Sequence, residues 1–124
     1  MNIKDKDAAN IGLSEAMHMM LKEMTDRDIF SDMKDGYRLA ASVALNRSID
    51  VSNHTLENRK NMYDVGGVDE DFIFRNAVAQ LYPEFEGQEY KHLEKFADVG
   101  VQIIYEQFDG TGGLNIEELM KNAP

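Results

Sequence analysis

The stretch Gln88-Glu-Tyr-Lys-His-Leu-Glu-Lys-Phe-Ala-Asp-Val-Gly-Val-Gln-Ile-Ile-Tyr-Glu-Gln-Phe108 decides the fold. Its apolar residues recur at helical spacing and form one continuous stripe. Gly100 lies within that stripe, where glycine costs about 1 kcal/mol relative to alanine. We expect a close crossing with another helix to compensate for this cost. The residues of the stripe are Leu93, Phe96, Ala97, Gly100, Ile103, Ile104 and Phe108.

Small side chains occupy the apolar side of a second predicted helix, which extends from about Asp32 to Leu45. Ser31 or Asp32 can cap its N-terminus, because both side chains accept hydrogen bonds from free backbone N–H groups. Its alanines allow a neighbouring helix to approach closely. The residues on this side are Met33, Tyr37, Ala40, Ala41, Ala44 and Leu45.

Three further helices are predicted. One extends from about Ser14, its N-cap, to Met24. Another, residues 69–81, stops at Tyr82–Pro83, because proline disfavours a helical backbone in the residue before it. A short amphipathic helix over residues 116–120 follows a glycine-rich break. The apolar residues of the helix over 69–81 are Phe72, Ile73, Ala77 and Leu81.

The segment Asn46–Gly67 has the weakest pattern. Ile49 and Val51 alternate like a short strand or an extended linker, which leaves open a short β-hairpin near residues 47–53. Residues 52–62 are compatible with a short helix. The Gly66–Gly67 pair is expected to interrupt the chain.

The composition favours one globular domain. The chain has 124 residues, of which 43% are hydrophobic and 29% are charged, and these values are typical of a single folded domain. We therefore expect an all-α fold, a single-domain bundle of four to five helices over residues 1–124. Residues 1–12 are expected to form a flexible N-terminal segment.

The chain contains no cysteine, and the segment Asn2–Asn10 is polar. The absence of cysteine excludes disulfides, thiolate metal sites and cysteine nucleophiles. The polar N-terminus does not resemble a signal peptide. No apolar run approaches the roughly 20 residues that a membrane helix needs. We expect a cytoplasmic protein that does not interact with a membrane.

The net charge is −10, from 23 acidic and 13 basic residues. This balance argues against direct binding of free nucleic acid, whose phosphates bind mainly to lysine and arginine. It fits a basic protein partner, DNA mimicry, or solubility alone. A local basic patch at Arg38, Arg47, Arg59 and Lys60 supports the alternative of a direct nucleic-acid-binding module.

One segment, Asp109-Gly-Thr-Gly-Gly-Leu-Asn-Ile-Glu-Glu-Leu-Met120, has the outline of an EF-hand loop. Such a loop needs oxygen ligands at positions one, three and five and a bidentate glutamate at position twelve. Here position five is Gly113 and position twelve is Met120. The segment is therefore expected to stop one helix and begin another, without binding calcium.

Two Glu-x-x-His sequences, Glu15–His18 and Glu89–His92, resemble the motif of di-iron helical bundles. Glu15 and His18 fall on the outward side of their helix, and His92 falls at the edge of its apolar side, so the motif cannot direct all its ligands inward. No nucleophile elbow, Walker motif or dinucleotide fingerprint is present. We expect no metal, no cofactor and no enzymatic activity. A metal-dependent helical-bundle enzyme is the least favoured alternative.

Two stretches resemble small proteins encoded beside bacterial DNA phosphorothioation (Dnd) defence genes. The first is Asp28-Ile-Phe-Ser-Asp-Met-Lys-Asp-Gly-Tyr-Arg-Leu-Ala-Ala-Ser-Val-Ala-Leu45, which has a phenylalanine, a short acidic turn and a helix with paired alanines. The second is Phe96-Ala-Asp-Val-Gly-Val-Gln-Ile-Ile104, which is followed by Leu119-Met120 near the end of the chain. Together they cover about a third of the chain, whereas residues 47–86 depart from the family. The resemblance implies a helical accessory protein of a bacterial defence system, and it carries over no catalytic or ligand residues.

The leading hypothesis is therefore a non-enzymatic accessory protein that docks on protein partners of a DNA-modification or phage-defence system. Met19 lies on the outward side of its helix, where an adaptable methionine suits a binding surface. A homodimer is also expected, because the two longest helices carry more small and apolar surface than one core needs. The candidate interaction surface comprises Met19, Tyr37, Arg38, Ala41, Arg47, Arg59 and Lys60.

Overall fold

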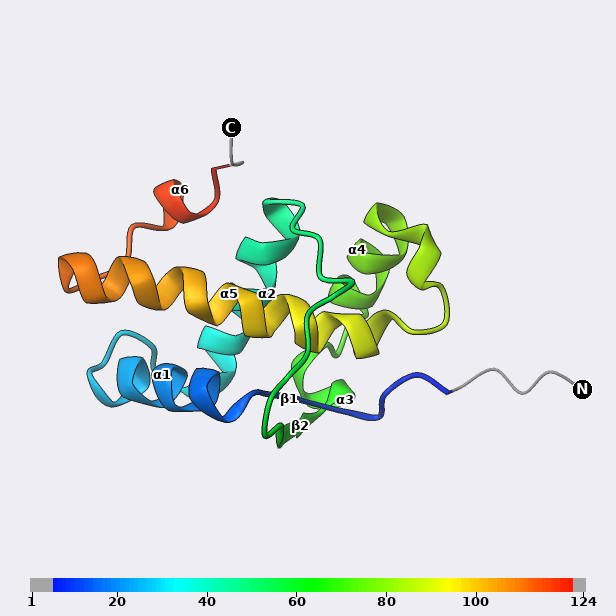
Figure 1. Ribbon diagram of the computed structural model, residues 1–124, viewed down its shortest axis with the longest axis horizontal. Helices are drawn as coiled ribbons and strands as arrows, with labels where there is room; N and C mark the ends of the chain where they lie inside the picture. The colour runs from blue at the N-terminus through cyan, green and yellow to red at the C-terminus, as the bar shows by residue number, and fades with distance from the viewer. Residues whose placement is uncertain (1–5, 122–124) are drawn as a thin grey trace, which may run out of the picture.

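Two long helices cross at the centre of the protein, as shown in the computed structural model of Figure 1, which describes residues 6–121. Helix α2 (Met33–Asn46) packs against helix α5 (Glu89–Thr111). Tyr37 and Val43 on α2, and Leu93 and Phe96 on α5, are fully buried in the core. The fold is mainly helical, and the two helices with the clearest sequence patterns form its core.

The crossing is close because its contact residues are small. A Cβ atom placed on Gly100 would lie 1.9 Å from the carbonyl oxygen of Ala40, so only glycine fits at this position. Ala40, Ala41 and Ala44 are all buried. The close crossing expected at Gly100 is confirmed, and the helix that crosses there is α2, which contacts α5 through its alanine side.

The remaining helices surround this pair. Helix α1 (Glu15–Asp26) packs against α5, and helix α4 (Ile73–Leu81) packs against α5 near its N-terminal end. The short elements are α3 (Val65–Val68), the 3₁₀ helix η1 (Pro83–Phe85) and α6 (Ile116–Leu119). None of the helices within residues 6–121 is long and apolar enough to cross a membrane.

Local capping explains where these helices begin. The Ser14 hydroxyl accepts the Met17 N–H of α1, and the Asp32 carboxylate accepts the Asp35 N–H of α2. These predicted N-caps are confirmed. Helix α4 begins four residues later than predicted, because the Asp69 carboxylate accepts backbone N–H groups at the fifth and sixth residues after it.

Two strands, β1 (Asn10–Leu13) and β2 (Lys60–Asp64), form a small antiparallel sheet, so the expectation of a strictly all-α fold is corrected to mainly α. The hairpin expected near residues 47–53 is wrong, because that segment forms turns and neither strand lies in it. The sheet joins segments almost fifty residues apart. Local alternation therefore did not reveal it.

Other expectations for the loops are also corrected. Residues 10–12 belong to β1, and Ile11 is fully buried, so a flexible segment through residue 12 is wrong for this part. The first part of that expectation, residues 1–5, lies outside the described residues. Residues 52–62 form turns and the start of β2 in place of a helix, and Gly66–Gly67 lies inside α3.

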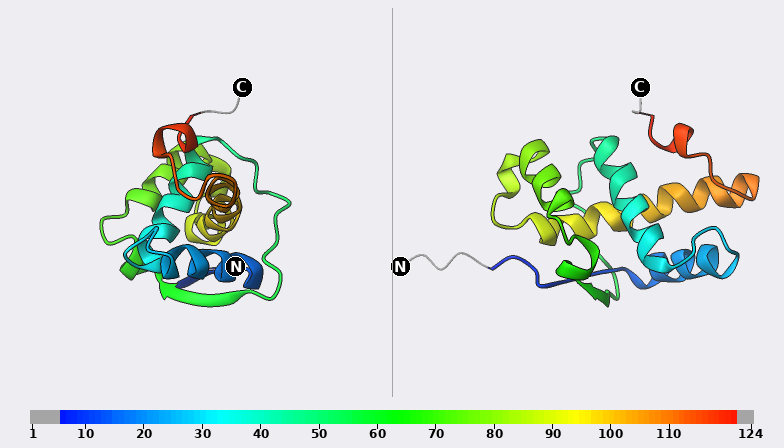
Figure 2. Two further views of the ribbon diagram at one scale, coloured as in Figure 1. Left: turned by 90° about the vertical axis from the view of Figure 1, so that its left-hand side faces the viewer. Right: turned by 180° about the vertical axis from the view of Figure 1, so that it is seen from behind.

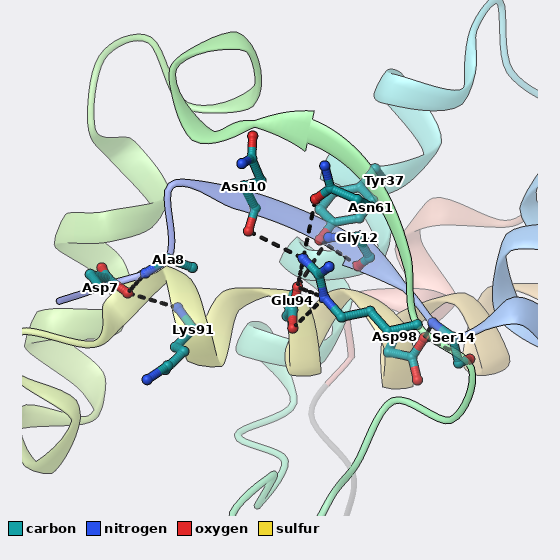
Figure 3. Close-up of polar contacts among 11 residues, drawn as sticks. Asp7, Ala8, Asn10, Gly12, Ser14, Tyr37, Asn61, Lys91, Glu94 and Asp98 are labelled. Atoms are coloured by element: carbon teal, nitrogen blue, oxygen red, sulfur yellow. Dashed lines mark hydrogen bonds and ion pairs between the residues drawn. The ribbon is translucent and has the colours of Figure 1, made fainter. Parts of the chain in front are cut away.

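Carboxylates on α5 hold β1 in place, as Figure 3 shows. Glu94 Oε1 accepts the Gly12 N–H at 3.1 Å, and Asp98 Oδ1 accepts the Ser14 N–H at 2.8 Å. The spacings match, because four helical residues rise about 6 Å and two strand residues span about 6.6 Å. Near the other end of this contact the roles are exchanged: α5 donates, and the Asp7 carboxylate accepts the N–H groups of Tyr90 and Lys91 at the N-terminus of α5.

Gly12 is required at the centre of this arrangement. Its carbonyl oxygen accepts a hydrogen bond from the Tyr37 hydroxyl at 3.0 Å, while its N–H donates to Glu94. A Cβ atom on Gly12 would lie 1.9 Å from the carbonyl oxygen of Lys60 on β2. A larger residue would therefore separate the strands from each other or from the core.

We predict opposite effects for two glycine-to-alanine substitutions in α5. Gly100→Ala should lower the free energy of unfolding by about 1–3 kcal/mol, because the new methyl group overlaps the α2 backbone. Gly110→Ala, where no atom lies within 4 Å of the new methyl group, should raise it by about 0.4–1 kcal/mol. Urea denaturation measures both. Equal effects of the two substitutions would contradict the close crossing.

Candidate functional site

Two members of the predicted interaction surface lie in the core. Tyr37 is fully buried and Ala41 is 1% exposed. Burial, followed by the nearby Glu94 and Asp98 carboxylates, raises the pKa of Tyr37 well above its ordinary value. Both residues are therefore corrected to structural residues, because the apolar side of α2 faces α5.

Arg38 and Arg47 bind the protein's own backbone. Arg38 donates to the carbonyl oxygens of Val68 and Gly67 at 3.0 and 3.2 Å. Arg47 donates to the carbonyl oxygen of Leu119 at 3.0 Å. These side chains fasten α3 and α6 to α2 from separate positions along the helix.

The other two predicted cations lie beside the sheet. Arg59 forms an ion pair with Glu94 at 2.9 Å, and its guanidinium also donates a hydrogen bond to the carbonyl oxygen of Asn10. Lys60 is exposed on β2. Three of the four cations therefore form intramolecular contacts, each with different elements of the fold, and no described contact brings the four together.

Met19 is 64% exposed, as its outward position predicted, and it lies on a groove of about 600 Å³. The start of α1, the loop 54–58 and one side of α5 form the walls. Most of the lining surface is apolar. The lining residues are Ser14, Glu15, Ala16, Met17, Met19, His54, Thr55, Glu57, Asn58, Asp98, Val99 and Gln102.

A buried carboxylate joins the three walls of this groove. Asp98 is 3% exposed, and its Oδ1 accepts both the N–H and the hydroxyl of Ser14. Its Oδ2 lies 2.7 Å from Nε2 of His54. Because a carboxylate only accepts hydrogen bonds, His54 Nε2 carries the hydrogen.

The order of these three residues differs from that of a catalytic triad. In a triad the histidine lies between the serine and the acid and removes the serine proton. Here Asp98 lies in the middle, and the Ser14 hydroxyl donates to Asp98 while it caps α1. The arrangement satisfies buried polar groups and positions the loop, and it does not activate Ser14 as a nucleophile.

Helix α4 carries apolar residues on two neighbouring sides. Val78 is fully buried and Phe74 is half-buried against the core. On the other side, Ile73 is 67% exposed and Leu81 is 57% exposed, with Ala77 between them. The apolar pattern predicted for this helix is present, but the residues that define it face outward.

Phe72 extends this exposed surface at the start of α4. It is 51% exposed, and the guanidinium of Arg75 lies 5.6 Å from its ring centre. We call Phe72, Ile73, Ala77 and Leu81 the α4 face. The sequence pattern that indicates such a face is a short helix whose apolar residues, Phe74 and Val78 included, span an arc too broad for one contact to cover.

Acidic residues lie at both ends of the α4 face. Glu70 and Asp71 precede it, and Glu84 follows it. All three are exposed, and none of the ion pairs formed among residues 6–121 includes them. Glu70, Asp71 and Ile73 also line a shallow cavity of about 360 Å³. The α4 face is therefore apolar at its centre and negatively charged at its ends.

Asp69 fixes the start of α4. Its carboxylate accepts the N–H groups of Phe74 and Arg75 and the Tyr90 hydroxyl at 2.9 Å. Burial and the hydrogen bond to Asp69 raise the pKa of Tyr90 to about 12. The α4 face therefore belongs to a helix whose start is fixed to α5 through Asp69 and Tyr90.

The residues of the EF-hand-like segment and of the two Glu-x-x-His sequences do not come together as metal ligands in the part of the chain that the structure describes. Helix α5 continues through Thr111, so the start of the EF-hand-like segment is helical. Glu15 is exposed, whereas Glu89 bonds Gly87 N–H and the His92 ring stacks on Phe85 at 3.6 Å. Within residues 6–121, no three histidine, aspartate or glutamate side chains are grouped to hold a metal ion.

The small residues that suggested a homodimer are used inside the protein. Ala40 and Gly100 contact each other, and they are buried in the α2–α5 crossing. Self-association remains a prediction, and this surface no longer supports it.

Comparison with protein-family models, curated proteins and solved structures finds no match for the chain.

We predict that the stability of the protein falls at alkaline pH partly through Tyr90. Between pH 10 and about 12 the folded protein keeps the Tyr90 proton while the unfolded chain loses it. The folded state then binds more protons, so the free energy of unfolding decreases as the pH rises through this range. Tyr90→Phe should make that decrease shallower in urea denaturation, and parallel pH profiles would contradict the assignment.

We also predict that Asp98 contributes to stability. Asp98→Ala should lower the free energy of unfolding by about 2–4 kcal/mol, because the Ser14 N–H and hydroxyl lose their acceptor. Asp109→Ala, which removes an exposed acid from the same helix, should change it by less than about 0.5 kcal/mol. Similar losses in the two variants would show that Asp98 is not a structural acceptor.

Proposed function

We propose that the protein is a non-enzymatic accessory protein that docks on a protein partner of a bacterial DNA-modification or phage-defence system. The α4 face is the surface that carries this proposal. The type of system comes from the resemblance of residues 28–45 and 96–104 to Dnd-associated proteins. The mode of action comes from the exposed apolar residues and the negative charge.

The exposure of Ile73 and Leu81 is the main support. Complete burial of such side chains stabilises a complex by about 1.5–3 kcal/mol each. They lie two helical turns apart with Ala77 between them, so a second helix can lie along α4 and cover both. Exposed apolar surface with a polar border is typical of a protein-binding site.

The acidic ends specify the chemistry of the partner. Glu70 and Asp71 at one end and Glu84 at the other suit a partner helix with basic residues near both ends of an apolar stripe. The net charge of −10 favours the same partner through long-range attraction. It also disfavours free DNA, and the engagement of Arg38, Arg47 and Arg59 within the protein leaves that alternative without a specific observation in its favour.

The test is a binding measurement with the purified full chain and the proteins encoded beside its gene, with duplex DNA as a separate sample. We expect one protein to bind with a dissociation constant in the micromolar range or below. Ile73→Glu combined with Leu81→Glu should weaken this binding at least tenfold, because each substitution removes more than about 1.4 kcal/mol of apolar contact.

Ile116→Glu is the matched control, because Ile116 is 49% exposed and lies on α6, away from α4. It should leave binding unchanged, and circular dichroism should show that all variants are folded. Absence of a protein partner at micromolar concentration would overturn the proposal. A dissociation constant that the α4 substitutions leave unchanged, or binding of duplex DNA without any protein partner, would also overturn it.

A further inference from the structure

We propose that the groove beside Ser14 binds a second protein segment, one that presents a lysine or arginine next to an apolar side chain. The groove is separate from the α4 face. In the end-on view of α5 in Figure 2 (left), the segment 47–59, whose residues 54–58 form one wall, and α4 lie on opposite sides of α5. One molecule can therefore hold segments on both sides at once.

The inner surface of the groove is apolar and adaptable. Met17 and Val99 are half-buried, and Met19 is largely exposed at the side of the groove. An unbranched thioether side chain adjusts its shape to different apolar groups. A methylene stem or a leucine-sized group would therefore find contact along this surface.

The charge of the groove selects a cation. Glu15 and Glu57 are exposed on its walls, and neither belongs to an ion pair among residues 6–121. The lining contains no lysine or arginine in the part of the chain that the structure describes, and His54 is bonded to Asp98. The walls thus repel phosphates and carboxylates and attract an ammonium or guanidinium group. Lysine and arginine combine such a group with an apolar stem.

The groove is held open before any ligand binds. The Glu15 N–H donates to the carbonyl oxygen of Glu57 at 3.2 Å, which ties the loop to the start of α1. Asp98 ties His54 and Ser14 to α5. Because walls fixed in this way lose little conformational freedom on binding, a short segment can bind without first ordering the loop.

With two docking surfaces on opposite sides of α5, the protein would act as a connector between two protein segments. This role rests on the proposed function for the α4 side. The groove can be tested independently of the α4 face, because the methyl signals of Met17 and Met19 report on the groove and that of Ile73 reports on the α4 face.

The experiment uses the full chain with ¹³C-labelled methionine and isoleucine methyl groups. The probe is an amphipathic peptide of fourteen leucine and lysine residues, and the control is its leucine–glutamate counterpart. We expect the methyl signals of Met17 and Met19 to shift and saturate with the lysine peptide, and to require at least tenfold more of the glutamate peptide. Glu15→Gln combined with Glu57→Gln should weaken the response at least fivefold.

Two control variants separate the surfaces. Glu70→Gln removes an acid beside the α4 face and should leave the Met19 response unchanged. Ile73→Glu combined with Leu81→Glu should also preserve it, even if those substitutions abolish partner binding. If the α4 face proves not to bind a partner while the Met19 signal still responds to the lysine peptide, the groove proposal is supported and the α4 proposal is not.

Three results would overturn the groove proposal. In one, only the Ile73 signal responds to the lysine peptide. In another, both peptides shift Met19 equally, which would show that charge does not select the ligand. In the third, the Met19 signal changes with protein concentration alone, which would assign the groove to a second copy of the chain.

Discussion

The contact between Gly100 and the backbone of Ala40 is the constraint on which the structure depends. Because no Cβ atom fits between them, α2 and α5 approach to backbone contact and bury their apolar sides together. Helix α5 then serves as the axis of the protein, since α1, α2, α4 and β1 all pack on it. The small residues that suggested self-association, such as Ala40 and Gly100, are therefore buried in the crossing of α2 and α5.

Acidic residues perform a structural role in this small domain that their number alone does not reveal. Asp7, Glu94 and Asp98 accept backbone N–H groups between α5 and residues 7–14, which include β1, and Asp69 does so at the start of α4. A carboxylate that accepts backbone N–H groups replaces the water it loses on burial, which makes its burial tolerable. The charge available for recognition is therefore carried by other acids, including those around the α4 face and the groove.

The two candidate surfaces differ in how the fold creates them. The α4 face exists because the apolar residues of this nine-residue helix span two neighbouring sides, and only one of them is buried against α5. The groove exists because the bonds from His54 and Ser14 to Asp98 fix the loop 54–58 and the start of α1 in place on α5. Both combine apolar contact with negative charge, and this shared chemistry is the reason that basic amphipathic segments suit the protein.

The sequence by itself determined the main helices, their caps at Ser14 and Asp32, the need for a close partner at Gly100, and the outward position of Met19. These features depend on helical spacing and on hydrogen bonds between residues a few positions apart, so a single sequence contains them. Only the tertiary structure decided the pairing of β1 with β2, the burial of Tyr37, the partners of the arginines, and the side of α4 that faces outward. Each of these depends on contacts between residues distant in the chain, such as Asp98 with Ser14 and His54. Helical periodicity can show that Ile73 and Leu81 share one side of a helix, but the packing of α4 on α5 decides that this side remains exposed.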